Sequence, residues 1–455
     1  MIERVEDFCQ QNKLFDRGDA IVVACSGGPD SLALADILLR MQQKWDLRLC
    51  IAHFEHGIRG AASEEDAAFV KSFAAGRDVF FRMESGNVPA YAHTQGLSLE
   101  TAARDMRYAF LRRVSRELGG AHIAVAHHAD DQAETVLMHI LRGSGLDGLA
   151  GMRPARAGII RPMLTVTRQE IEAYCAERGL KPRHDATNDI PDCRRNQLRL
   201  GLLPELRQKY NPSVTAALCQ LSLLAADESD FISAEVEGLW TKLTKWQGTA
   251  LLLDAEKLKA KHPVLQRAVF RRAAEKLRGS LQGIGFVHIE ALRDMLKGPT
   301  GTRITLPGEL TAQMSYGWLR LEAGRQEERR ALAPAELKVP GVTDLPASGL
   351  CVEAELLTQR PELQGPWQFC CDFDRLEGRL FVRQRQPGDR LQMSYGSKKL
   401  KDFFVDVKVP RDQRDDVLLF CDGRGILWVA GLRGTILAQT DAATKRFLYL
   451  RISKK

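Results

Sequence analysis

The sequence contains no Cys-x-x-Cys pair, although ten cysteines are spread over its 455 residues. Zinc and iron–sulfur sites commonly use such pairs, so we expect neither of them, and no disulfide framework. No apolar run approaches the roughly 18–20 residues of a transmembrane helix. The first residues form an amphipathic pattern unlike that of a signal peptide. These absences predict a cytoplasmic protein that makes no membrane contact.

A Walker-type phosphate loop, G-x-x-x-x-G-K-[ST], is also absent, as are internal repeats and low-complexity tracts. The composition, with 27% charged and 44% hydrophobic residues, allows large cores and gives no sign of disorder. The chain length predicts two or three domains. A net charge of +7 favours a polyanionic partner. This preference is weak, because many enzymes without such a partner are equally basic.

Short apolar runs alternate with helical patterns over the first part of the chain. The runs are "AIVVAC", "LRLCIAHF", "DVFFRM", "HIAVAHH" and "IIRPML". This alternation predicts an α/β domain with a doubly wound parallel sheet, whose ligands bind beyond the carboxyl ends of the strands. A helical region and then short alternating strands such as "GRLFVRQRQ" and "KDFFVDVKV" follow. We therefore expect a catalytic domain over 1–214, a helical domain over 215–325 and a small β-rich (α+β) domain over 326–455.

The stretch "IVVACSGGPDSLALADILL" places a glycine turn between a strand and a helix. Gly27 and Gly28 would let the backbone approach a ligand closely. The turn amides and the positive end of the helix dipole suit an anion such as a phosphate. Ser26 and Ser31 add hydroxyl donors, and Pro29 fits the first helical turn. The turn is therefore a candidate phosphate site.

Asp30 narrows the kind of ligand that this turn is predicted to bind. A carboxylate beside phosphates repels them unless Mg²⁺ lies between, so Asp30 implies a metal–phosphate complex. The alternative is a tight strand–helix turn in which Asp30 is an ordinary first-turn residue. We read Cys25, which precedes the turn, as a small buried residue at the strand end.

The string "SGGPDS" resembles the S-G-G-x-D-S pyrophosphate loop (PP-loop) of the ATP pyrophosphatases, which cleave ATP between the α and β phosphates. Four later segments resemble the tRNA(Ile)-lysidine synthetase family in the same order along the chain. They are "HFEHGIRGAASEEDAAFV", "ETAARDMRYAFL", "AVAHHADDQAETVLMHILRGSGLDGLAGM" and "DATNDIPDCRRNQLRLGLLPEL". The resemblance is dense from about residue 20 to 210 and looser in the C-terminal region.

The resemblance implies an ATP site made by residues 26–31 and His53, with Asp30 holding Mg²⁺. Phe54 and Glu55 stand where Val-Asn is common in the family. Arg59 would meet a phosphate, and Arg107 would reach the α-phosphate or the tRNA backbone. An ordinary solvated helix face is the alternative reading for Arg104, one turn before Arg107.

Asp131 and Glu134 are spaced i, i+3, so both can point into one cleft. Acidic groups beside an anion site suit a cationic ligand, such as the ammonium groups of free lysine or a second Mg²⁺. One of the two would orient or deprotonate the lysine amine, and the sequence leaves open which. Acids that merely complement the helix dipole are the alternative. His127 and His128 lack metal-ligand companions, and we interpret them as lining the site or as structural.

Basic residues form two candidate tRNA contacts. Arg195, Asn196 and Arg199 would lie on one helix near the phosphates and the tRNA; the alternative is a basic helix capped by Asp185, Thr187 or Asn188. In the C-terminal region Tyr395, Phe403 and Phe404 are interleaved with basic residues, a pattern that fits the phosphate backbone of RNA. A solvated surface is the alternative. The candidate contacts there are Arg383, Arg385, Lys398, Lys399 and Lys401.

The resemblance implies that ATP adenylates the wobble cytidine of tRNA(Ile) with a CAU anticodon, and that the side-chain amine of L-lysine then replaces AMP at C2. This reaction changes the codon read from AUG to AUA and the amino-acid identity from Met to Ile. Two other classes stay open: another PP-loop enzyme that thiolates tRNA or adenylates a small molecule, and a tRNA-binding protein without catalysis. The sequence leaves the oligomeric state open, a homodimer included.

Overall fold

The computed structural model describes residues 1–57, 61–183, 194–324, 332–346, 348–409 and 413–454. The chain divides into two compact units, residues 1–231 and 232–455. In the described part of the chain, no helix combines the length and apolarity needed to cross a membrane.

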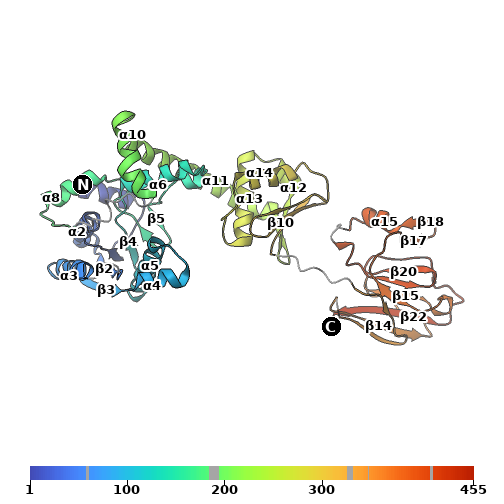
Figure 1. The fold of residues 1–455 in the computed structure, drawn as a ribbon. Helices are drawn as coiled ribbons and strands as arrows, with labels where there is room; N and C mark the ends of the chain where they lie inside the picture. Colours follow the sequence, from blue (N-terminus) through green and yellow to red (C-terminus); the bar gives the residue numbers. More distant parts are fainter. Residues whose placement is uncertain (58–60, 184–193, 325–331, 347, 410–412, 455) are drawn as a thin grey trace. The chain divides into compact units, whose positions relative to one another are not determined.

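The first unit contains a sheet flanked by helices (Figure 1). Its described strands follow the order β3-β2-β1-β4-β6-β5. All neighbouring pairs are parallel except β5 with β6. The prediction of a doubly wound parallel α/β domain is therefore confirmed. The strands are β1 (Ala20–Ala24), β2 (Arg48–Glu55), β3 (Phe80–Ser85), β4 (His122–Ala124), β5 (Ala155–Arg156) and β6 (Ile159–Ile160).

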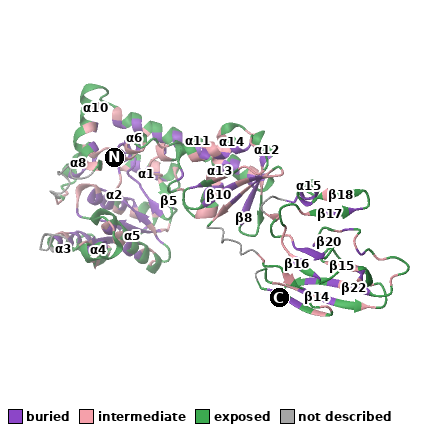
Figure 2. Ribbon diagram, turned by 45° about the vertical axis from the view of Figure 1, so that its right-hand side comes forward, coloured by how far each residue is buried: buried purple, intermediate pink, exposed green. Residues whose placement is uncertain are grey.

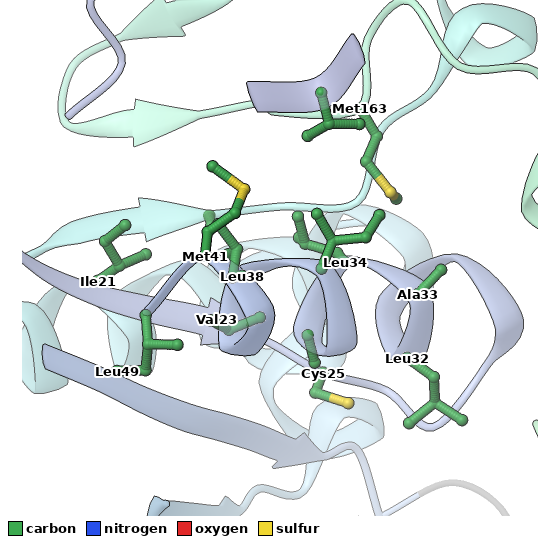
Figure 3. Close-up of a cluster of buried hydrophobic side chains, with 14 of the residues drawn as sticks. Ile21, Val23, Cys25, Leu32, Ala33, Leu34, Leu38, Met41, Leu49 and Met163 are labelled. Atoms are coloured by element: carbon green, nitrogen blue, oxygen red, sulfur yellow. The ribbon is translucent and has the colours of Figure 1, made fainter. Parts of the chain in front are cut away.

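Helices cover both faces of this sheet because side chains alternate along each strand. Ile21 and Val23 pack with α1, α2 and α8, whereas Val22 packs with α4 and α5 on the opposite face. Figure 3 shows part of the first cluster, where Cys25 packs with β1, β2 and α2. Cys25 is buried, as we expected. The helices are α1 (Ile2–Gln11), α2 (Pro29–Trp45), α3 (Ala61–Ala75), α4 (Val88–Gln95), α5 (Leu99–Glu117), α6 (Ala129–Leu141), α7 (Leu146–Leu149) and α8 (Arg168–Glu177).

Further helices lead from the first unit into the second. The 30-residue helix α11 belongs to both units, because the division between them falls inside it. The helical reading of this region is confirmed. The helices are α9 (Arg194–Gln197), a π-helical turn (Leu198–Leu202), α10 (Leu203–Lys209), α11 (Val214–Leu243), α12 (Ala255–Lys259), α13 (Pro263–Arg278) and α14 (Phe286–Met295).

The middle of the chain also contains an antiparallel sheet that the sequence analysis did not anticipate. Its described strands follow the order β7-β8-β11-β10-β9, and α13 and α14 share a buried core with it. Figure 2 shows buried residues along β8 and β10. The strands are β7 (Thr244–Gln247), β8 (Ala250–Asp254), β9 (Arg303–Leu306), β10 (Leu310–Ser315) and β11 (Trp318–Ala323).

The C-terminal region is rich in antiparallel strands, as predicted. Its described sheets are β12-β16-β19-β20-β21, β13-β14-β22-β15 and the hairpin β17-β18. The strands are β12 (Ala335–Glu336), β13 (Gly341–Leu345), β14 (Leu350–Leu357), β15 (Gln368–Asp372), β16 (Phe381–Arg383), β17 (Arg390–Met393), β18 (Gly396–Lys399), β19 (Leu419–Asp422), β20 (Gly425–Val429), β21 (Arg433–Gly434) and β22 (Phe447–Lys454). A short 3₁₀ turn spans Phe373–Arg375.

The segment "KDFFVDVKV", which we expected to be a strand, begins in a helix, α15 (Leu400–Asp406). The strand prediction is therefore wrong. Leu400, Phe403 and Phe404 are all buried, and their spacing of three and four residues matches one face of a helix. The two phenylalanines belong to the core and cannot stack on bases. Tyr395 is exposed.

Candidate active site

The glycine loop lies between the last residue of β1, Ala24, and Pro29, the first residue of α2. Gly27 has a φ of +91°, a left-handed conformation that residues with a Cβ rarely adopt. A Cβ at this position would also lie 3.4 Å from the side chains of Phe69 and Val70 in α3. The backbone conformation therefore favours glycine here, whereas the packing would admit a Cβ in ordinary van der Waals contact.

The Ser31 hydroxyl organises this loop. It accepts hydrogen bonds from the backbone N–H groups of Ser26 and Gly27, over 3.1 and 3.2 Å, and donates to the Gly28 carbonyl over 3.0 Å. Ser31 is also buried. The hydroxyl that we expected to contact ATP thus serves the shape of the loop itself in this structure.

Two further contacts hold the loop against its neighbours. His53, buried near the end of β2, places its Nδ1 2.9 Å from the carbonyl oxygen of Cys25. The backbone N–H of Arg183 donates to the carbonyl of Gly27 over 3.0 Å. His53 therefore lies beside the loop, where its observed contact is with the backbone.

Asp30, in the first turn of α2, has two carboxylate oxygens in different environments. Oδ2 accepts a hydrogen bond from Arg168 Nη1 over 2.9 Å. Oδ1 is buried and accepts no hydrogen bond from the described residues. Burial raises the pKa of Asp30, although His128 and Arg168 oppose this effect. One oxygen is thus fixed, and the other lacks the partner that a buried carboxylate oxygen normally has.

This arrangement fits a magnesium ion at Asp30 Oδ1. Mg²⁺ is typically held by one or two carboxylates together with substrate phosphates and water. Among the described residues, no group of three or more His, Cys, Asp or Glu side chains could enclose a metal by itself.

Asp131 and Glu134 form an ion-pair network with two arginines that we assigned to tRNA. Glu134 accepts hydrogen bonds from Arg195 Nε over 2.7 Å and Arg199 Nε over 2.5 Å. Asp131 Oδ1 accepts from the Nη2 atoms of the same arginines, over 2.8 and 2.9 Å. The Glu134 side chain is only 1% exposed. The two acids therefore do point toward one region, but that region already contains two guanidinium groups.

The two acids differ within this network. Both oxygens of Glu134 accept from the arginines, so its role in this structure is to hold Arg195 and Arg199. Asp131 Oδ2 instead accepts from the backbone N–H of His128 over 3.2 Å. Burial favours the neutral form of Asp131, but His128 and the arginines outweigh burial and lower its pKa. Asp131 is therefore the carboxylate that lies nearer to the glycine loop.

His128 joins the glycine loop to this network. Its Nε2 lies 3.9 Å from Asp30 Oδ1 and 3.4 Å from Asp131 Oδ2. The residue is buried between β4 and α6. Arg168, whose backbone N–H donates to Asp130 over 2.8 Å, closes the same region from α8. The loop and the acidic network thus make one site at the carboxyl ends of β1 and β4, where the sheet topology predicts it.

Arg107 on α5 is half-buried, and its guanidinium lies 5.5 Å from the centre of the Tyr108 ring. Burial lowers the pKa of Arg107, and the neighbouring charge of Arg104 adds to this effect. No ion pair joins Arg107 to a carboxylate of the described residues. Arg107 therefore carries a positive charge that these residues leave without a counter-ion.

The five candidate tRNA contacts of the C-terminal region divide into two groups. Three form ion pairs: Arg383 with Asp389, Arg385 with Asp415, and Lys398 with Asp406. The Arg383 pair is bidentate, over 2.8 and 2.9 Å, and little exposed, as in a structural pair. Lys399 and Lys401 are exposed, and no ion pair joins either to a carboxylate of the described residues. These two lysines are the better placed to meet a phosphate backbone.

Some predicted residues cannot be located, and others were missed. Arg59, Asp185, Thr187 and Asn188 lie outside the described residues. Arg168 begins α8 and contacts Asp30, a role that was not predicted from the sequence. An arginine in the first turn opposes the helix dipole, and this local conflict was the one available signal.

Three family models match the chain. They are a PP-loop domain over residues 2–206, a TilS substrate binding domain over 253–320 and a TilS substrate C-terminal domain over 380–451. A solved TilS C-terminal domain is 32% identical and covers 27% of this chain and 96% of its own, with a TM-score of 0.25. The three matched segments are spread along almost the whole chain.

Curated relatives match over the full length. The tRNA(Ile)-lysidine synthase of Caldanaerobacter subterraneus subsp. tengcongensis is 33% identical, and the match covers 100% of this chain and 98% of the relative. The tRNA(Ile)-lysidine synthase of Symbiobacterium thermophilum is 36% identical, again covering 100% of this chain and 98% of the relative. The chain therefore belongs to the tRNA(Ile)-lysidine synthase family.

Proposed function

We propose that the protein joins the side-chain amine of L-lysine to C2 of the wobble cytidine in a tRNA(Ile) with a CAU anticodon, converting ATP to AMP and pyrophosphate. The observation that carries this proposal is the position of His128 between Asp30, 3.9 Å away, and Asp131, 3.4 Å away. A phosphate loop and an acidic group thus share one site. Such a pairing suits ATP activation followed by attack of an amine, and relatives named for lysidine synthesis match the whole chain.

The reaction needs two steps because the C2 carbonyl of cytosine is a poor electrophile. The C2 oxygen first attacks the α-phosphorus of ATP, the bond to the bridging oxygen breaks, and pyrophosphate leaves. The nitrogen of the lysine side chain then forms a bond to C2, the C2–O bond breaks, and AMP leaves with that oxygen. The amine gives up one proton in this second step. The wobble base is unpaired in an anticodon loop and can be splayed into a pocket.

The glycine loop supplies the first step. The N–H groups of Ser26 and Gly27 donate to Ser31 in this structure, so the backbone amides at the N-terminal end of α2 would face the phosphates. Fixed donors of this kind stabilise the charge that develops on pyrophosphate. Ser31 shapes the loop, and His53 holds its first carbonyl. Mg²⁺ at Asp30 would neutralise charge on the phosphate oxygens. Arg107 would add a permanent positive charge near the α-phosphate.

Asp131 is the stronger candidate to receive the lysine amine. Glu134 is almost fully buried and uses both oxygens on Arg195 and Arg199. Asp131 Oδ2 accepts from the backbone N–H of His128 and lies 3.4 Å from His128 Nε2, the atom that also approaches Asp30. Its lowered pKa keeps it ionised at neutral pH, so it orients an ammonium group. Glu134 then acts as a positioning residue.

For tRNA binding we propose Arg195 and Arg199 near the cytidine and, in the C-terminal region, Lys399 and Lys401 above all. Arg383, Arg385 and Lys398 would contribute only if they exchange their carboxylate partners for phosphates. We further propose that the division into 1–214, 215–325 and 326–455 separates catalysis from tRNA binding, and that the enzyme works in the cytoplasm.

The deciding experiment combines the purified protein, Mg²⁺, ATP, labelled L-lysine and a tRNA(Ile) transcript with a CAU anticodon. We expect label to enter the RNA only with ATP, with one AMP and one pyrophosphate formed per lysine transferred. A matched transcript with uridine at the wobble position should remain unlabelled. Transfer without ATP, or pyrophosphate release that never accompanies lysine transfer to RNA, would contradict the proposal and favour another PP-loop reaction.

A further inference from the structure

Helix α11 contributes side chains to the hydrophobic cores of both units. In the second unit, Val236, Trp240 and Leu243 are buried together with side chains of β8 and α13. In the first unit, Leu218 is buried together with Ala133 of α6. An α-helix is stiff because its backbone hydrogen bonds connect every turn to the next. A displacement of one end of α11 therefore acts on the other end.

The side-chain amide of Gln132 joins α6 both to α11 and to the segment 147–153, which contains the end of α7. Nε2 donates to the Met152 carbonyl over 3.0 Å, and Oε1 accepts from the Met152 N–H over 2.8 Å. Nε2 also donates to the Ser222 hydroxyl on α11 over 2.6 Å, and this hydroxyl donates to the Ala150 carbonyl over 2.8 Å. Because both side chains are buried, they make these hydrogen bonds within the protein and not to water.

Two further side chains of α11 hold the same segment. Ser229 Oγ donates to Asp147 Oδ1 over 2.7 Å. Asp230 accepts two hydrogen bonds from the guanidinium of Arg153, over 2.9 and 3.1 Å. Together with Ser222, these contacts attach the segment 147–153 to α11 at three points. The segment is therefore expected to follow a movement of this helix.

Helix α11 also supports both elements that make the ion-pair network of the active site. The Cys219 thiol donates to the carbonyl of Ala129, the first residue of α6, over 3.4 Å. Leu218 packs with Leu198, which directly precedes Arg199. Helix α6 carries the two acids of the network, and Arg199 is one of the two arginines that bind them. A shift of α11 would therefore reach both the acids and the arginines.

We propose that Ser222 and Gln132 are positioning residues through which α11 couples tRNA binding by the second unit to the geometry of the active site. The second unit contains residues 253–320, which match the TilS substrate binding domain, and the proposed tRNA contacts Lys399 and Lys401. Apolar contacts are non-directional and tolerate small displacements, whereas a buried hydrogen bond is lost when its partners separate. The bond between Gln132 and Ser222 therefore fixes the position of α11 along α6. This inference rests on the proposed lysine transfer and adds a route by which binding far from the wobble base acts on catalysis.

The test is hydrogen–deuterium exchange of the backbone amides of the segment 147–153, followed by mass spectrometry without ATP or lysine. A full tRNA(Ile) transcript is compared with its isolated anticodon stem–loop. We expect the full tRNA to slow exchange of this segment in the wild-type protein about 3–10-fold, as for the net contribution of one neutral hydrogen bond. Ser222→Ala should remove this slowing, while the dissociation constant of the full tRNA stays within about twofold. Ser233→Ala, at an exposed position of the same helix, is the matched control and should behave as the wild type does.

Single-turnover lysine transfer at saturating enzyme separates a positioning role from a merely structural one. Ser222→Ala should slow transfer to the full tRNA about 3–10-fold. Transfer to the stem–loop should change by less than about twofold, because the stem–loop lacks the parts of the tRNA that the second unit is proposed to bind. Equal slowing with both RNAs would show that Ser222 acts only on the stability of the first unit. Exchange decides the proposal even where transfer to the stem–loop is too slow to measure.

Equal slowing of exchange by the stem–loop, or slowing that survives in Ser222→Ala, would overturn the proposal, since the tRNA would then protect the segment by direct contact. Exchange that does not respond to the full tRNA in the wild-type protein would overturn it as well. Ser222→Cys keeps most of the side-chain volume and is used if the alanine variant does not fold; it should show an intermediate slowing. Because exchange is measured without ATP and lysine, failure of lysine transfer in the wild-type protein would contradict the proposed function separately.

Discussion

Arg168 Nη1 donates a hydrogen bond of 2.9 Å to Asp30 Oδ2, joining two residues that are 138 positions apart in the sequence. The backbone N–H of Arg168 donates to Asp130, so the start of α8 is fixed to the start of α6 as well. With Oδ2 held in this way, Asp30 Oδ1 keeps a defined position without a hydrogen bond from the described residues. Arg168 is therefore a positioning residue for the carboxylate that we propose to meet the metal–ATP complex.

Arg168→Gln should raise the KM for ATP by roughly 5–30-fold, corresponding to about 1–2 kcal/mol for a charged hydrogen bond at a partly exposed pair. The KM for lysine should change far less. Pyrophosphate release at varied ATP and Mg²⁺ measures the effect, and raising Mg²⁺ should recover part of it. Arg4→Gln is the matched control, because Arg4 makes an exposed ion pair with Glu170 on the same helix. An unchanged KM for ATP would rule out the positioning role.

Asp30→Ala should abolish AMP formation and leave the dissociation constant of tRNA nearly unchanged. The reason is that Asp30 offers the unpartnered oxygen, whereas the proposed tRNA contacts are elsewhere. AMP is measured by chromatography, and tRNA binding by filter retention. Asp30→Asn, which keeps the shape, should be equally inactive if the negative charge is what holds Mg²⁺. Loss of tRNA binding together with AMP formation would instead make Asp30 a structural residue.

Glu134→Gln and Asp131→Asn should show that Glu134 contributes mainly to stability and Asp131 mainly to lysine binding. The glutamine variant removes the buried charge that the Nε atoms of Arg195 and Arg199 bind, although Asp131 Oδ1 still accepts from both. We expect the free energy of unfolding of the first unit to fall by about 2–4 kcal/mol. The asparagine variant should lower stability less and raise the KM for lysine more. Urea unfolding and lysine-dependent kinetics measure the two effects. The reverse pattern would show that Glu134 receives the amine.

The lowered pKa of His127 predicts that the free energy of unfolding falls in mild acid. Its pKa in the folded protein is about 3, chiefly because of burial, whereas an unfolded histidine titrates near 6.5. As pH falls below about 6.5, the unfolded state binds a proton that the folded state cannot bind until about pH 3. Unfolding is thereby favoured by up to about 2 kcal/mol at pH 5.

His127→Gln should remove most of this loss between pH 7.5 and 5, as measured by urea unfolding at the two pH values. His93→Gln, at an exposed position in α4, serves as the control and should retain the wild-type pH dependence. A wild-type protein equally stable at both pH values would show that His127 is protonated in the folded state.

Lys399→Gln with Lys401→Gln should reduce the salt dependence of tRNA binding. Each phosphate contact contributes roughly 0.7–0.9 to the slope of log K against log salt, so the slope should fall by about 1.5. Arg383→Gln breaks the little-exposed pair with Asp389 and should mainly lower the melting temperature of the C-terminal region. Filter binding at several salt concentrations, with thermal melting in parallel, separates the two effects. If Arg383→Gln changed the salt slope more than the double lysine variant did, Arg383 would be the tRNA contact and the two lysines would not.

The parallel sheet and the glycine loop could be predicted because their signals are local. Five apolar runs mark strands of the first sheet, and Gly27, Pro29 and Asp30 carry the turn within a few residues of one another. The sheet β7–β11 was missed although β10 alternates buried and half-buried residues. The helices α12–α14 separate β7 and β8 from β9–β11, so the pairing of β8 with β11 has no local signal. The strands β9, β10 and β11 follow one another directly, and this hairpin pattern was a local signal that the prediction overlooked. For α15, the spacing of its phenylalanines fitted a helix better than the strand we predicted.

The sequence alone determined that a phosphate loop ending in Asp30 precedes a pair of acids, and that basic residues follow both. It could not show which charges meet, because attraction between charges depends on distance in space and not on separation along the chain. Only the tertiary structure decided that Arg195 and Arg199 bind Asp131 and Glu134, that Arg168 holds Asp30, and that Arg383 is bound to Asp389. Burial determined which of these charged side chains need a partner, because an enclosed charge requires an opposite charge or a hydrogen bond whereas an exposed charge is solvated by water.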